Sequence, residues 1–70
     1  MQIILYRLRK ENGLSQSDLA EVIGKSETSY RNKELGKQDF RSTEMFKIAN
    51  YFHKNIGDIF IDTTSRNEKL

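Results

Sequence analysis

Residues 15–36 read SQSDLAEVIGKSETSYRNKELG, and the first half of this stretch predicts a short helix over residues 16–23. Ser15 can cap the start of the helix, and Asp18 follows three residues later, which is the spacing of a capping box. Apolar residues then recur at helical spacing, namely Leu19, Val22 and Ile23. Gly24 ends this helix, because glycine adopts the left-handed conformation at little steric cost.

The second half of the stretch predicts another helix, over residues 27–35. Ser26 offers an N-cap and Gly36 stops the helix. Tyr30 and Leu35 are its large interior candidates, and the other positions are polar. Such a helix is either an ordinary solvated surface helix or one that enters a groove. Two helices separated by about three residues, with a glycine in the turn, have the layout of a helix-turn-helix.

A helix over residues 3–11 comes before this stretch and ends at Asn12-Gly13. Its apolar side is formed by Ile4, Leu5 and Leu8. Residues 36–41 follow the stretch as a loop, in which Phe40 is expected to anchor into the core.

The most regular amphipathic pattern predicts a helix over residues 43–52. Its core residues recur at i, i+3, i+4 and i+7, namely Met45, Ile48, Ala49 and Phe52. Arg41 lies three residues before Glu44, where a capping side chain is expected, but arginine cannot accept a hydrogen bond. The cap therefore either moves to Ser42 or is lost. His53, the sole histidine, is expected to act as a C-terminal cap.

Asn55 and Asp58 have the spacing of a second capping box, which would open a short last helix. The apolar residues of this helix are Ile56, Ile59 and Phe60. Residues 62–70, DTTSRNEKL, are polar and are expected to form a frayed tail. The sequence thus predicts one domain over residues 1–61.

Composition limits the possible functions of this 70-residue chain. It has no cysteine, which excludes disulfides and thiolate metal sites. A formal net charge of +2 and a pI near 9.0 are mildly basic, as nucleic-acid binding favours. We expect no enzyme, metal or cofactor, because there is no Gly-rich phosphate loop, no thiol nucleophile and one histidine without an evident carboxylate partner. The sequence contains neither a secretory signal nor a membrane-span pattern, so we expect a cytoplasmic protein.

The order of motifs resembles the lambda repressor/Cro-like (XRE-type) helix-turn-helix family of DNA-binding regulators. The central matches are Leu14-Ser15-Gln16, Leu19-Ala20, Ile23-Gly24, Ser26, Tyr30, Asn32-Lys33-Glu34 and Gly36-Lys37. Outer matches extend the resemblance over roughly residues 3–61, namely Leu8-Arg9, Phe40, Ile48-Ala49 and Ile59-Phe60. The residues from Tyr30 to Phe40 are similar to those of small phage-type regulators of Gram-positive bacteria.

This resemblance implies an all-α, five-helix domain that binds double-stranded operator DNA, as repressors do. Gln16 would contact the DNA backbone beside the start of helix 16–23, whose free amides suit a phosphate. Helix 27–35 would enter the major groove. Its residues nearest the bases would be Ser26, Glu27, Thr28, Arg31 and Asn32. Phosphates would be met by Lys37 and, more weakly, by Lys33 and Lys25. The alternative role of Glu27 is to stabilise the helix start electrostatically.

Two structural expectations also come from the resemblance. Arg9 and Glu34 are expected to form an ion pair. A single recognition helix reads only a few base pairs, so we expect a weak homodimer on a two-fold operator. Part of Ile59–Ile61 would then face the partner subunit.

Two other functions remain possible at the level of sequence. The domain could be an antitoxin-like or other partner-binding module that also touches DNA, or a module that binds only protein. Salt-dependent binding to duplex DNA separates these readings, because a basic groove-binding protein loses affinity steeply as salt rises.

Overall fold

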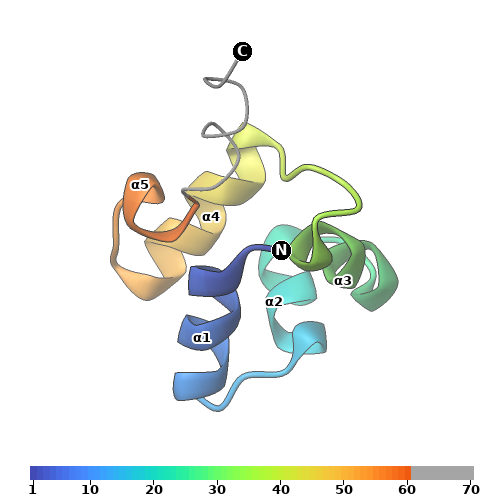
Figure 1. The fold of residues 1–70 in the computed structure, drawn as a ribbon, viewed down its shortest axis with the longest axis horizontal. Helices are drawn as coiled ribbons and strands as arrows, with labels where there is room; N and C mark the ends of the chain where they lie inside the picture. The colour runs from blue at the N-terminus through green and yellow to red at the C-terminus, as the bar shows by residue number, and fades with distance from the viewer. Residues whose placement is uncertain (61–70) are drawn as a thin grey trace.

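A computed structural model describes residues 1–60, and within them the chain forms five α-helices and no β-strand (Figure 1). The helices are α1 (Ile3–Glu11), α2 (Gln16–Ile23), α3 (Glu27–Leu35), α4 (Ser42–Phe52) and α5 (Ile56–Ile59). The predicted all-α, five-helix architecture is therefore confirmed. The predicted tail, residues 62–70, lies outside the described residues, so the domain boundary stays a prediction.

The predicted helix-turn-helix is formed by α2 and α3. Ser15 Oγ accepts a hydrogen bond from the Asp18 N–H at 3.0 Å, and Asp18 Oδ2 accepts one from the Ser15 N–H at 2.9 Å, so the predicted capping box is present. Gly24 ends α2 in the left-handed conformation, with φ of 71°. Ser26 then opens α3, because its Oγ accepts from the Ser29 N–H at 3.1 Å.

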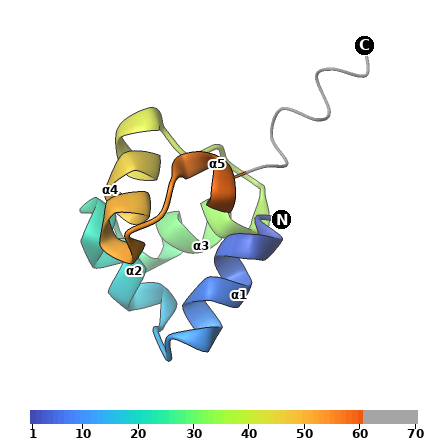
Figure 2. The ribbon, with the colours of Figure 1, turned by 90° about the vertical axis from the view of Figure 1, so that its left-hand side faces the viewer.

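The helices pack so that α2 contacts both α3 and α4, while α1 contacts α3 and α5. The short helix α5 also contacts α4 and closes the core on the side seen in Figure 2. Core residues come from every helix, with Leu5, Leu19, Tyr30, Ile48 and Ile59 the most deeply buried of the apolar ones. The expected inward-facing residues of α2, Leu19, Ala20 and Ile23, are all buried.

Phe40 anchors the loop between α3 and α4, as predicted. Its ring is buried and lies edge-on to the rings of Tyr30 and Phe60, at centroid distances of 5.9 Å and 5.1 Å. Aromatic pairs in this geometry add about 0.5–1.5 kcal/mol beyond their buried area. Because Tyr30 belongs to α3, this aromatic cluster fixes the helix-turn-helix to the rest of the domain.

The start of α4 differs from the prediction by one residue. The helix begins at Ser42, with Arg41 as the N-cap residue. Glu44 accepts a hydrogen bond from the Arg41 N–H at 2.9 Å, which is one half of a capping box. The other half is missing among the described residues, because arginine offers no acceptor and Ser42 is already inside the helix.

The end of α4 is a left-handed turn at His53, which has φ of 57°. His53 therefore is the C-terminal cap residue that the sequence predicted. The prediction of a second capping box, at Asn55 and Asp58, is wrong, however. Asn55 precedes α5 as its N-cap residue, but its side chain makes no cap hydrogen bond with the described residues.

The sequence predicted that part of Ile59–Ile61 faces a partner subunit, and two of these three residues are buried within one subunit. Ile59 is 1% exposed and Phe60 is 7% exposed, so both belong to the core of a single subunit. Ile61 lies outside the described residues. Within residues 1–60, no helix is both long and apolar enough to cross a membrane.

Candidate nucleic-acid interface

The inner side of α3 is held by the carboxylate of Glu34, which is 1% exposed. Arg9 of α1 donates from Nε to Glu34 Oε2 at 2.9 Å and from Nη2 to Oε1 at 3.2 Å. Tyr30 donates its hydroxyl to Oε2 at 3.0 Å, and Gln16 donates from Nε2 to Oε1 at 3.0 Å. The structure therefore brings Arg9 and Glu34 together in a buried, bidentate ion pair. Glu34 joins α3 both to α1 and to the start of α2.

The buried Glu34 carboxylate raises the pKa values of two neighbours, Arg9 and Tyr30. Burial acts to lower the pKa of the Arg9 guanidinium, but the hydrogen bond and charge of Glu34 raise it above its usual value. Burial raises the pKa of the Tyr30 hydroxyl far above its usual range, and the charge of Glu34 adds to the effect. Arg9 thus stays charged and Tyr30 stays a neutral donor.

A second buried ion pair, Lys33 with Glu44, was not predicted. Lys33 Nζ lies 2.7 Å from Oε1 and 2.8 Å from Oε2 of Glu44, and both residues are buried. The expectation that Lys33 contacts a phosphate is therefore wrong, since its ammonium group faces inward. The signal was present in the sequence: Lys33 lies three residues after the interior Tyr30, on the same side of the helix.

Glu44 has two functions at this junction. Its carboxylate accepts from the Arg41 N–H, at the start of α4, and from Lys33 of α3. Burial acts to raise the pKa of Glu44, but the Arg41 amide and the Lys33 ammonium together hold it below its usual range. The charged carboxylate of Glu44 thus connects α3 to α4.

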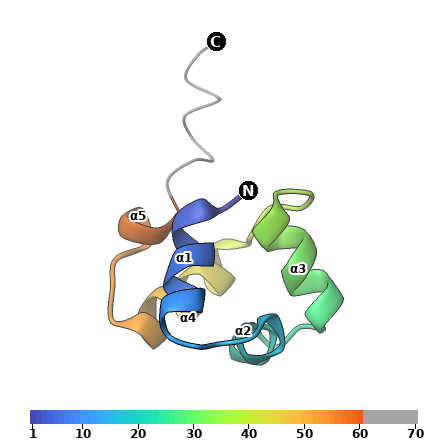
Figure 3. The ribbon, with the colours of Figure 1, turned by 60° about the horizontal axis from the view of Figure 1, so that its bottom comes forward.

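The outer side of α3 is polar, and no other helix within residues 1–60 covers it (Figure 3). The predicted base-reading residues there are exposed, namely Ser26, Glu27, Thr28 and Arg31, with Asn32 half-buried. Leu35 was expected in the interior but is 41% exposed. It lies seven residues, or two turns, after Thr28 and so shares the outer side of the helix. Leu35 therefore adds an apolar side chain to the otherwise polar outer side of α3.

The Arg31 side chain is held by two described neighbours, Gln16 and Glu27. Its Nε donates to Gln16 Oε1 at 3.3 Å, and its Nη2 lies 3.9 Å from Glu27 Oε2. The predicted phosphate contact Lys37 is exposed in the loop after α3. The backbone places it there, because the Lys37 N–H donates to the Asn32 carbonyl at 2.8 Å.

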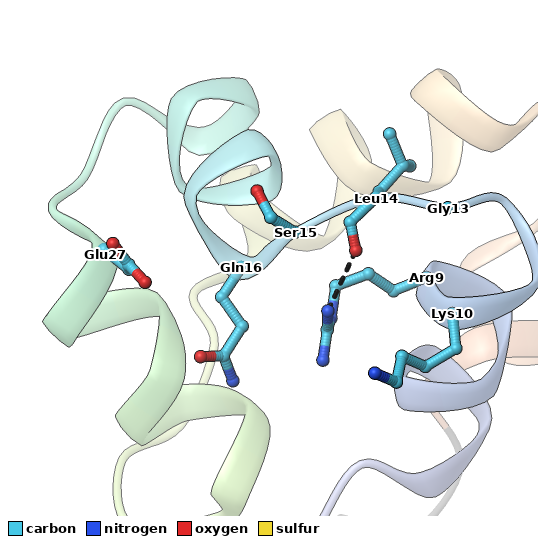
Figure 4. Close-up of a pocket in the computed structure, with 7 residues that line it drawn as sticks. All are labelled: Arg9, Lys10, Gly13, Leu14, Ser15, Gln16 and Glu27. Carbon is cyan, nitrogen blue, oxygen red and sulfur yellow. Dashed lines mark hydrogen bonds between the residues drawn. The ribbon is translucent and has the colours of Figure 1, made fainter.

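An open hollow of about 700 Å³ lies beside the start of α2, and Figure 4 shows the side chains around it. Its lining residues come from α1, the following loop and the starts of α2 and α3, namely Arg9, Lys10, Gly13, Leu14, Ser15, Gln16 and Glu27. Arg9 Nη1 donates to the Leu14 carbonyl at 2.9 Å and so fixes the loop that forms one wall. Lys10 also lines the hollow and was not predicted as a site residue. Its position one residue after the paired Arg9 places a second cation beside the start of α2.

A family model described as "Helix-turn-helix" matches residues 5–59. The chain belongs to this helix-turn-helix family. It is the lambda repressor/Cro-like, XRE-type family that the order of motifs resembled. Searches of curated proteins and of solved structures gave no significant match.

Family membership makes this helix-turn-helix protein a DNA-binding regulator whose partner is double-stranded DNA. The matched residues begin in α1 and end at the last residue of α5. The match therefore includes the buried pairs that hold α3, together with its polar outer side.

Proposed function

We propose that this helix-turn-helix regulator acts as a repressor/Cro-like protein that reads operator DNA with α3 in the major groove. The observation behind the proposal is the division of α3 into two sides. Tyr30, Lys33 and Glu34 hold its inner side in buried contacts, whereas its outer side is polar and exposed. A rigid helix with a free polar side suits the groove, whose base edges present hydrogen-bond donors and acceptors.

The side chains on the outer side have distinct chemistries for base edges. Asn32 can bond an adenine edge in two places, and Arg31 can do the same at guanine or contact a phosphate. Thr28 can hydrogen-bond a base or touch a thymine methyl group, and Ser26 can donate or accept. Glu27 can accept from cytosine, although its position in the first turn of α3 also favours the helix electrostatically.

Phosphates on either side of the groove would be held by groups around the hollow and by the loop after α3. The start of α2 offers backbone amides and the positive end of the helix dipole. The second N–H of the Gln16 side-chain amide, Lys10 at the hollow and Lys37 in the loop add donors. Lys25 is exposed between α2 and α3 and is a weaker candidate.

We also propose that two subunits bind one two-fold operator, since one recognition helix reads too few base pairs for a specific site. Their recognition helices would stand about 34 Å apart, one turn of DNA. Ile59 and Phe60 are buried within one subunit, so the contact between subunits would use other residues. It would be small, and pairing would depend on DNA.

The experiment is selection of bound duplexes from random DNA, followed by binding measurements at several salt concentrations. We expect a palindromic site and an affinity that falls steeply with salt, as phosphate counterions are released. A module that binds only protein would show no duplex binding even at low salt. Single asymmetric half-sites at every protein concentration would contradict the homodimer.

A further inference from the structure

The side-chain amide of Gln16 lies between two charged groups that determine its orientation. Its Nε2 donates to the buried Glu34 at 3.0 Å, and its Oε1 accepts from Arg31 at 3.3 Å. A carboxylate can only accept and a guanidinium can only donate. The reversed amide would set two acceptors against each other on one side and two donors on the other. The amide therefore has a single orientation, with its oxygen toward the recognition helix surface.

We propose that Gln16 is a positioning residue for Arg31. Glu34 holds the side-chain amide of Gln16, and the oxygen of this amide holds the Arg31 guanidinium. Arg31 is therefore already positioned on the outer side of α3 before DNA is bound. This inference rests on the proposed DNA-reading function of α3. It assigns the amide oxygen of Gln16 a function that is separate from any phosphate contact by the amide nitrogen.

Glu34 is a suitable anchor because it cannot move independently. Its two oxygens are bonded by Arg9 Nε and Nη2 and by the Tyr30 hydroxyl, all in the interior. Arg31, by contrast, has a long side chain that is 46% exposed. Its contact with Glu27 at 3.9 Å is exposed and contributes little by itself. Gln16 is therefore the neighbour that connects Arg31 to the rigid interior.

An arginine that is already positioned loses less side-chain entropy when it binds. Gln16 should thus increase DNA affinity through Arg31, whether Arg31 contacts a guanine or a phosphate. If Gln16 contacts DNA only by itself, its contribution will not depend on the residue at position 31. A double-mutant cycle distinguishes the two cases.

The cycle compares Gln16→Met in the natural protein and in the Arg31→Ala variant, with affinity measured on the preferred duplex. Methionine keeps the length of the side chain but has no amide, and Glu34 Oε1 keeps its bond from Arg9 Nη2 at 3.2 Å. We expect Gln16→Met to weaken binding on the order of fivefold more when Arg31 is present, the equivalent of one net hydrogen bond. Equal losses in the two backgrounds would overturn the proposal.

The matched control is Gln38→Met, because Gln38 is an exposed glutamine in the loop after α3. It should cause the same change in both backgrounds. If Gln16→Met does not fold, as judged by circular dichroism, Gln16→Asn replaces it in the cycle. Asparagine keeps an amide, but it is one methylene shorter and cannot reach both Glu34 and Arg31.

A measurement on the free protein separates this inference from the proposed function. In a ¹⁵N spectrum, Gln16→Met should shift the Arg31 Nε–Hε resonance and speed its exchange with water, whereas Gln38→Met should leave it unchanged. If the natural protein binds no duplex, the proposed function fails while this spectrum still tests the positioning. If it binds duplex DNA but Gln16→Met leaves the Arg31 resonance unchanged, the positioning role is wrong.

Discussion

Replacing Arg9 with alanine should destabilise this domain more than any exposed charge substitution. The change removes both bonds from Arg9 to Glu34 and the bond from Arg9 to the Leu14 carbonyl. Glu34 is 1% exposed, so its charge would remain in the interior without a cation. Tyr30 and Gln16 would still donate to it, and these neutral bonds offset only part of the loss.

Breaking a buried pair in this way costs about 3–5 kcal/mol. The two remaining donors place the expected loss near the lower end, at about 3 kcal/mol. A domain of 70 residues has a total stability of only about 4–10 kcal/mol. The melting temperature should therefore fall by roughly 12–24 °C. Thermal unfolding followed by circular dichroism measures this shift directly.

The control is Arg7→Ala, since Arg7 is an exposed arginine on the same helix. Its melting temperature should change by a few degrees at most. Adding Glu34→Gln to Arg9→Ala should restore part of the stability, because glutamine removes the unpaired charge and still accepts from Tyr30. Equal, small shifts for Arg9→Ala and Arg7→Ala, or no recovery in the double variant, would refute the assigned cost of the unpaired carboxylate.

Three further predictions concern other parts of the domain. His53→Gly should raise the free energy of unfolding by about 1 kcal/mol, because the left-handed conformation at φ of 57° strains any residue with a Cβ; an unchanged or lower melting temperature would contradict this. Glu44 has a lowered pKa in the folded state, so its contribution to stability is complete above its ordinary value of 4.5 and is lost as the pH falls through the lower folded value. Glu44→Gln should therefore be less stable at neutral pH and lose less stability on acidification, and parallel pH profiles would contradict the assignment. Lys37→Ala should weaken binding to all duplexes similarly and reduce the salt slope by about one unit, whereas a loss confined to one sequence would mean that Lys37 reads a base.

The helices of the DNA-binding unit could be predicted from sequence because their ends are set by local chemistry. The bounds of α1, α2 and α3 match the prediction. Ser15, Asp18 and Gly24 act within a few residues of one another, so their spacing alone specifies the start and end of α2. Where a local signal was ambiguous the prediction was less accurate: Arg41 cannot cap, and α4 begins one residue earlier than expected.

Contacts between distant residues were much harder to predict. Lys33 and Glu44 are separated by 11 positions, and a lysine in a polar helix is usually solvated. The position of Lys33 on the same side of α3 as Tyr30 was the one local signal of its burial, and it did not identify Glu44 as the partner. The Arg9–Glu34 pair spans 25 positions and was expected only from the family resemblance. The orientation of the Gln16 amide depends on Glu34 and Arg31 together, which only the folded arrangement reveals.

The exposed residues of α3 show a different limit. Thr28 and Asn32 were expected on the outer side of α3, and the structure leaves Thr28 exposed and Asn32 half-buried there. Leu35 was misplaced because a large apolar residue near a helix end is usually interior. Thr28 is exposed and Asn32 is partly so, and their contacts with bases stay a prediction.

The most direct test of base reading by α3 is the ratio of affinities for the preferred duplex and a scrambled duplex, measured for Thr28→Ala and Asn32→Ala. If these side chains contact base edges, each change should reduce the preference by about 1–3 kcal/mol and relax it at one base pair. Binding to the scrambled duplex should be nearly unchanged, since the phosphate contacts remain. If both variants keep the natural ratio, α3 is not the element that reads the operator.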